Sequence, residues 1–139
     1  MAKLLPEVIA LFQDPAVPKM VATVSRDGEL NVTPKTSMTA VDDETLAFAD
    51  LYGRTTRTFK NLEETGKVAI VAMKVPVAPP FTTYQVKGTF RQYLTSGPVF
   101  DQFAAALKAA MGVVISGVGT VKVDAVYSQA PQDKGKQIV

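Results

Sequence analysis

Four polar side chains between residues 54 and 61 have the types and the spacing to bind an anion. They are spaced i, i+3, i+4 and i+7, so a helix would place them on one face: Arg54, Arg57, Thr58 and Asn61. The first N–H groups of a helix lack partners within it, and guanidinium groups bind phosphate oxygens in pairs. The segment is therefore a candidate phosphate site. Taken alone, it is more simply explained as a surface helix with a threonine cap and solvated arginines.

A second polar stretch lies in the strand expected over residues 30–41. Strand alternation places its polar side chains on one face: Asn31, Thr33, Lys35, Ser37 and Thr39. Pro34 has no N–H to donate to a neighbouring strand, so it marks a sheet edge or a bulge where backbone groups are free to contact a ligand. Taken by itself, this stretch is explained as an ordinary edge strand. Taken together with the arginine segment, it favours one ligand-binding site formed by both.

Composition limits the classes of protein that this chain can represent. Its 139 residues and 47% hydrophobic content suit one globular domain. The 15 basic residues barely exceed the 13 acidic ones, which argues against a nucleic-acid partner. No run of apolar residues approaches the roughly 20 that a membrane span needs, and the N-terminus does not resemble a secretory signal. We therefore expect a cytoplasmic protein with no membrane partner.

The absence of two residue types narrows the chemistry further. The chain contains no cysteine, so disulfides and thiolate nucleophiles are excluded, and no histidine, the commonest metal ligand and acid–base group. The acidic run at residues 42–44 is better explained as a turn between strands than as a metal site. We therefore expect no metal.

Hydrophobic periodicity and turn residues predict three helices and six strands. One helix begins at Pro6 and ends before Asp14, a second carries the arginine segment, and a third runs from Pro98 to Gly112. The strands are expected over residues 19–25, 30–41, 45–50, 67–75, 82–94 and 113–127. Consecutive strands on short turns predict a closed or nearly closed antiparallel barrel, because closure removes exposed edges. Residues 1–130 would form this domain, and residues 131–139 a polar, loosely held C-terminal tail.

The order of these segments resembles the pyridoxamine 5′-phosphate oxidase-like FMN-binding split barrels, and most closely their small FMN-binding members. The resemblance rests on residues 30–35, 51–61 and, less strongly, 84–88. It implies a mainly β fold with flanking helices, a six-stranded antiparallel split β-barrel. It also implies FMN bound at the subunit interface of a homodimer, and a role as an electron-transfer protein or a flavin reductase-like oxidoreductase of small substrates.

The resemblance also assigns cofactor-binding positions. Thr56, Arg57 and Thr58 would hold the FMN phosphate, and Lys35 would add positive charge from the neighbouring strand. The complete set that it implies is Val32, Thr33, Pro34, Lys35, Leu51, Tyr52, Thr56, Arg57, Thr58, Asn61 and Gln85. Arg54 matches no position of the family pattern. Lys35 and Lys87 are the candidates for the positive group that tunes the flavin, and no catalytic residue is identified.

Several alternatives stay open at this point. A deazaflavin-dependent reductase would use the same barrel, and a cofactor-free binding barrel would leave the arginine segment solvated. Pyridoxal phosphate is a weaker alternative, because no lysine stands out as a Schiff-base former. True pyridoxamine phosphate oxidation is not expected, because the family's oxidases hold that substrate with a C-terminal arginine and histidine. Heme-handling relatives are disfavoured because their heme attachment resembles histidine ligation, and this chain has no histidine.

Overall fold

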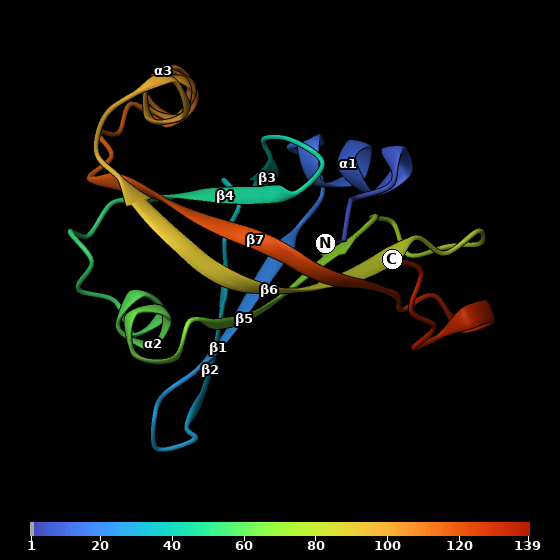
Figure 1. Cartoon of the computed structure of the whole chain (residues 1–139). Helices are drawn as coiled ribbons and strands as arrows, with labels where there is room; N and C mark the ends of the chain where they lie inside the picture. The colour runs from blue at the N-terminus through green and yellow to red at the C-terminus, as the bar shows by residue number, and fades with distance from the viewer. Residues whose placement is uncertain (1) are drawn as a thin grey trace.

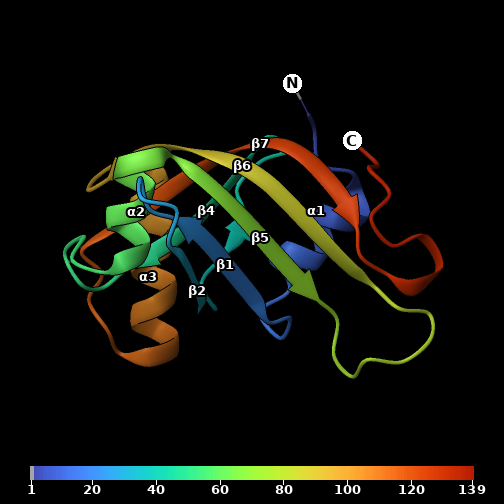
Figure 2. The same cartoon turned by 90° about the horizontal axis from the view of Figure 1, so that it is seen from below.

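Seven antiparallel strands form one sheet in the order β2-β1-β5-β6-β7-β4-β3. The computed structural model describes residues 2–139. The strands are β1 (Lys19–Val24), β2 (Leu30–Pro34), β3 (Thr39–Ala40), β4 (Thr45–Asp50), β5 (Lys67–Met73), β6 (Thr83–Leu94) and β7 (Gly117–Ser128). The helices are α1 (Pro6–Gln13), α2 (Arg57–Thr65), α3 (Pro98–Met111) and the short 3₁₀ helix η1 (Pro131–Asp133). Figures 1 and 2 show the sheet curling like half of a barrel, with the helices around it.

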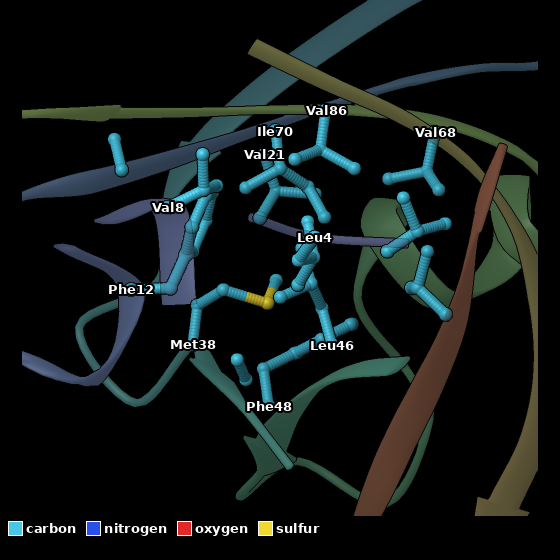
Figure 3. Packing of buried hydrophobic residues seen from close by; sticks show 14 of the residues in the cluster. Leu4, Val8, Phe12, Val21, Met38, Leu46, Phe48, Val68, Ile70 and Val86 are labelled. Atoms are coloured by element: carbon cyan, nitrogen blue, oxygen red, sulfur yellow. The ribbon is translucent and has the colours of Figure 1, made fainter. Parts of the chain in front are cut away.

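The concave face of the sheet carries the main core. Val21, Ile70, Val86 and Val126 are partners across β1, β5, β6 and β7, and each is fully buried. Paired residues of neighbouring strands point to the same face, so this row of valine and isoleucine defines the inner face. Side chains from α1, including Phe12, complete the cluster (Figure 3). Most of the inward-facing residues of these strands, which alternate with outward-facing ones, are apolar, so together they form one continuous apolar interior.

The mainly β, antiparallel fold with flanking helices is confirmed, with seven strands instead of the expected six. The expected strand over residues 30–41 is wrong, because β2 ends at Pro34 and β3 begins only at Thr39. Between them the chain turns, and the Met38 N–H donates to the Lys35 carbonyl at 3.1 Å. The Met38 side chain is fully buried in the core, and this packing interrupts the strand. The alternation of polar and apolar residues cannot reveal such a contact. The turn connects the two outermost strands of the sheet.

The end of the chain is more ordered than expected. Its last strand is β7, which begins at Gly117 and not at residue 113. The tail over residues 131–139 is not loosely held, because it folds back onto β7. The Ile138 N–H donates to the Val126 carbonyl at 2.9 Å, and the Ser128 N–H donates to the Lys136 carbonyl at 2.8 Å. The apolar side chains of Ile138 and Val139 pack on the core, which a purely polar tail would not do.

The described part of the chain contains neither a membrane-spanning helix nor an acidic metal cluster. Over residues 2–139, no helix has the length and apolar character to cross a membrane. The same residues contain no group of three or more acidic side chains arranged to hold a metal ion.

Candidate functional site

The first turn of α2 is fixed by a threonine cap. Thr56 has an extended backbone, and its hydroxyl accepts a hydrogen bond from the Phe59 N–H at 3.4 Å. The helix therefore begins at Arg57, whose side chain is exposed at the end where backbone N–H groups lack helical partners. Within residues 2–139 the Arg57 guanidinium forms no ion pair. This arrangement leaves Arg57 available to bind an anion.

Arg54 does not share the helix face expected from its spacing. The residue precedes α2 and has a left-handed φ of 68°, which is unusual for a residue other than glycine. Its guanidinium forms an ion pair with Glu63, with an Nε–Oε1 distance of 2.7 Å, and lies 4.5 Å from the centre of the Tyr93 ring. The predicted four-residue stripe is therefore wrong, because the cap at Thr56 starts the helix after Arg54. The Arg54 guanidinium therefore already contacts Glu63 and Tyr93 and is not free to bind an anion.

The other two residues of the stripe lie beneath α2. Thr58 is 2% exposed, and its hydroxyl accepts a hydrogen bond from the Asn31 side-chain amide at 3.3 Å. Asn61 is fully buried and donates to the Thr23 hydroxyl at 3.1 Å. Its side-chain oxygen has no hydrogen-bond partner among residues 2–139. Together these contacts hold the first turn of α2 against β1 and β2, and so connect the two polar stretches found in the sequence.

The edge strand β2 offers unpaired backbone groups, as Pro34 predicted. The Lys35 N–H donates to the Lys19 carbonyl at 3.0 Å. Together with the register, this bond shows which residues of β2 are hydrogen-bonded to β1 and which are not. In an antiparallel pair, hydrogen-bonded and non-hydrogen-bonded positions alternate. Thr33 therefore bonds to β1, and the N–H and C=O of Val32 point to the open edge. The backbone of β2 can thus contact a ligand there.

Lys35 reaches from the end of β2 toward the end of β4. Its ammonium nitrogen lies 5.7 Å from the centre of the Phe48 ring, and the side chain is half-buried. Burial lowers the pKa of Lys35, and the negative charge of Asp50 opposes this shift. Lys35 forms no ion pair within residues 2–139. It therefore places a second cation on the same side of the fold as the loop that precedes α2.

Asp50 organises that loop, although it belongs to no sequence motif that marks it as a site residue. Its fully buried carboxylate accepts hydrogen bonds from the Tyr52 N–H at 3.0 Å, the Arg54 N–H at 2.7 Å and the Tyr93 hydroxyl at 2.7 Å. Burial and the bond to Asp50 raise the pKa of Tyr93. The sequence feature that could have identified Asp50 is its position as a carboxylate at the end of the otherwise apolar strand β4. Through these bonds Asp50 fixes the backbone of the predicted contacts Leu51 and Tyr52.

Gln85 lies apart from the other predicted residues. The register pairs Pro34 with Met20, Met20 with Val71, and Val71 with Gln85. Three strand spacings, about 14 Å in all, therefore separate Gln85 from Pro34. This row faces away from the core, and Lys87 follows on the same outer face, 4.8 Å from the centre of the Tyr127 ring. The structure joins the start of α2 to β2 through Thr58 and Asn31 and brings Lys35 to Phe48 of β4, whereas Gln85 and Lys87 lie on the outer face.

The donors of this region fit a phosphate monoester. They comprise an exposed guanidinium, a lysine ammonium, a threonine hydroxyl and the free N–H groups of a helix start, all of which favour negatively charged oxygen. The Asp50 carboxylate already accepts three hydrogen bonds and forms no ion pair with these cations within residues 2–139. The chemistry of the side chains therefore agrees with the phosphate end of a nucleotide cofactor.

Comparisons with known proteins give a family match and several similar structures. The family model described as pyridoxamine 5′-phosphate oxidase matches residues 6–139. HupZ of Group A Streptococcus is 25% identical, with a TM-score of 0.79 over 98% of this chain and 99% of that chain. An FMN-binding protein of Syntrophomonas wolfei is 20% identical, with a TM-score of 0.70 over 79% of this chain and 75% of that chain.

A third similar structure has a different described role. HutZ of Vibrio cholerae, described as a heme storage protein, is 15% identical, with a TM-score of 0.64 over 91% of this chain and 94% of that chain. At that identity the likeness shows the fold alone, as it does for the Syntrophomonas protein. The comparison with curated proteins found no match.

Proposed function

Because the chain belongs to the pyridoxamine 5′-phosphate oxidase family, we propose that it binds FMN and works as an electron-transfer protein or a small-substrate oxidoreductase. The observation that carries this proposal is the guanidinium of Arg57, exposed at the start of α2 and without an ion pair within residues 2–139. A phosphate group would give this guanidinium the charged partner that it lacks among these residues.

The proposed roles follow from the position of each residue. Arg57 would bind two phosphate oxygens through its guanidinium, and Thr58 would supply a hydroxyl from the same turn. Lys35 would add positive charge from the end of β2. The open backbone of Val32 and the loop backbone at Tyr52 would line the rest of the cofactor. Buried Asn61 would support the site from beneath α2, through its bond to Thr23.

The protein residues would mainly bind and orient the cofactor. Bound FMN supplies hydride or one-electron chemistry by itself, so no protein acid or base has to be assigned. A cation near the flavin ring would favour its reduced, anionic form. Lys35, at the end of β2 and beside Phe48, would fill this role within one chain, since Lys87 lies on the outer face beside Tyr127. Pyridoxamine phosphate oxidation remains outside the proposal, since the chain has no histidine.

The visible spectrum of the natively purified protein, with the mass of the released cofactor, tests the proposal directly. FMN should give a flavin spectrum and the mass of FMN. A deazaflavin would give a different absorption maximum and mass. Heme, the cofactor suggested by the description of HutZ, would give an intense Soret band. A colourless protein that also fails to bind added FMN at micromolar concentration would refute the proposal.

Replacing Arg57 with alanine should weaken FMN binding about ten- to a hundredfold, because a charge-assisted hydrogen bond contributes roughly 1.5–3 kcal/mol. The dissociation constant can be measured by titrating apoprotein with FMN and following flavin fluorescence. Arg91→Ala is the matched control, because Arg91 is also exposed but lies on β6, and it should change the affinity less than twofold. Equal affinities for the two variants would place the phosphate elsewhere.

The position of Gln85 supports a homodimer as the binding form. Within one chain Gln85 lies three strands from β2 and on the outer face of the sheet, so a second copy could bring its own Gln85 to the cofactor held by Arg57. The outer face of the sheet carries unusually exposed apolar side chains, with Leu30 85% and Val32 63% exposed. Apolar side chains gathered on one face are typical of protein contacts. We therefore propose that two copies meet on this face, with FMN between them.

A single charge on the outer face should disrupt this dimer. Val32→Glu would bury a carboxylate at the contact, so the variant should run as a monomer in analytical ultracentrifugation and lose FMN affinity. Val77→Glu is the control, because Val77 is 57% exposed but lies in the loop between β5 and β6. It should keep the oligomeric state of the unmodified protein. A Val32→Glu variant that stays dimeric would rule out this face as the contact.

A further inference from the structure

A groove separate from the proposed FMN phosphate site lies between α1 and α3. It has a volume of about 590 Å³, within the range of small-molecule sites. Figure 1 shows α1 and α3 on either side of β3, and residues of these three elements line the groove. Its floor is formed by residues 36–41, which directly follow Lys35.

The walls of the groove are mostly apolar. Phe12 and Met38, both part of the core cluster in Figure 3, line its inner side. Phe103, Leu107 and Met111 of α3 line the other side. Met111 is 60% exposed, so the apolar surface of α3 is only partly covered by the protein itself. An apolar ligand would bury this surface, and such burial stabilises a complex by roughly 25 cal/mol per Å².

One lining residue, Lys19, brings a buried cation to the groove. Its side chain is only 2% exposed, and its ammonium group donates one hydrogen bond, to the Asp14 carbonyl at 2.7 Å. Lys19 forms no ion pair within residues 2–139, and none of the described lining residues is acidic. An ammonium group has three donors, so two of them remain for a ligand. A buried cation normally has a charged partner.

We propose that this groove binds a small amphipathic carboxylate. The apolar body would lie between α1 and α3, and the carboxylate would accept hydrogen bonds from the free donors of Lys19. The Asp14 carboxylate lies close enough to oppose the lowering of the Lys19 pKa by burial, but it forms no ion pair with Lys19 within residues 2–139. The ligand carboxylate would supply that ion pair and cover the exposed side of Met111. The proposal is independent of FMN, because none of the residues that carry it belongs to the α2 site.

Octanoate and 1-octanol test the proposal, because they share a chain and differ in the charge of the head group. We expect the unmodified protein to bind octanoate at least tenfold more tightly than octanol in isothermal titration calorimetry. Lys19→Met keeps most of the side-chain volume and removes the charge, so it should weaken octanoate binding about ten- to a hundredfold. Octanol binding should change less than twofold. Lys74→Met, at an exposed lysine outside the groove, should leave octanoate binding unchanged.

A second variant keeps the test valid if Lys19→Met does not fold. Ala106 is exposed on α3 and lines the groove, so Ala106→Phe should fill the space without disturbing the core and should abolish octanoate binding. Unchanged octanoate affinity in Ala106→Phe would overturn the proposal, as would equal binding of octanoate and octanol. The proposal would also be overturned if the unmodified protein does not bind octanoate and Ala106→Phe changes the oligomeric state. That result would assign the groove to a contact between copies of the chain.

Discussion

Replacing Phe59 with alanine should lower the free energy of unfolding by about 3–5 kcal/mol, the range for buried phenylalanine. Phe59 is fully buried, and its ring centre lies 5.3 Å from that of Phe48 and 5.4 Å from that of Tyr93. The substitution removes these contacts and leaves a cavity between α2 and the sheet. Urea unfolding followed by circular dichroism should show a lower midpoint with an unchanged slope, and the melting temperature should fall by roughly 10–20 °C.

Phe81→Ala is the matched control for this prediction. Phe81 is a phenylalanine of the loop between β5 and β6, and its side chain is only partly buried. The same chemical change should therefore cost about 1 kcal/mol or less. Similar losses in the two variants would contradict the idea that the aromatic cluster around Phe59 holds α2 on the sheet. Because α2 carries Arg57, the Phe59 variant should also lose FMN affinity.

Replacing Asp50 with asparagine should destabilise the protein by about 2–4 kcal/mol. The carboxylate of the unmodified protein accepts three hydrogen bonds. An amide nitrogen in place of Oδ2 would leave the Arg54 N–H facing a donor and would remove the acceptor of the Tyr93 hydroxyl. An unpaired buried polar group costs roughly 1–3 kcal/mol. The loop over residues 51–55 should loosen as a result. Urea unfolding and FMN titration of the same sample should both record the change.

Asp124→Asn supplies the comparison for Asp50. Asp124 also accepts a hydroxyl hydrogen bond, from Thr89 at 2.6 Å, but its side chain is exposed, so the change should stay within about 0.5 kcal/mol. Combining Asp50→Asn with Tyr93→Phe should give a loss smaller than the sum of the single losses, by about 1 kcal/mol. Strict additivity would mean that Asp50 and Tyr93 act independently.

The parts of the fold that local sequence determines were predicted well. α1 and α3 begin at prolines, and α3 ends before Gly112, which adopts a φ of 67°. The clean alternation of β6 located that strand within one residue. Strands β1 and β4 were also predicted close to their observed bounds. In these elements, the residues that begin the helix or strand, end it and face the core lie close together in the sequence.

The errors arose where contacts between distant segments decide the structure. Residues 30–41 alternate well enough for one strand, but the burial of Met38 in the core breaks them into two. Arg54 has helical spacing from Arg57, yet Asp50, Tyr93 and Glu63 hold it outside the helix. Asp50 itself was missed because its importance comes from Tyr93, 43 residues away in the chain. Arg57 and Lys35 were assigned by family resemblance, and their role in binding FMN stays a prediction.

The position of β2 and β3 at opposite edges of the sheet has a consequence for biosynthesis. The two strands are neighbours in sequence, but β3 is joined to the sheet through β4, which pairs with β7. Phe48 of β4 lies opposite Gly119 of β7, so most of the chain must leave the ribosome before this pair can form. Until then the apolar side chains of β4, buried in the native protein, stay uncovered. During synthesis the chain therefore carries an exposed apolar segment of the kind that favours aggregation, and we expect the pairing of these distant strands to slow folding.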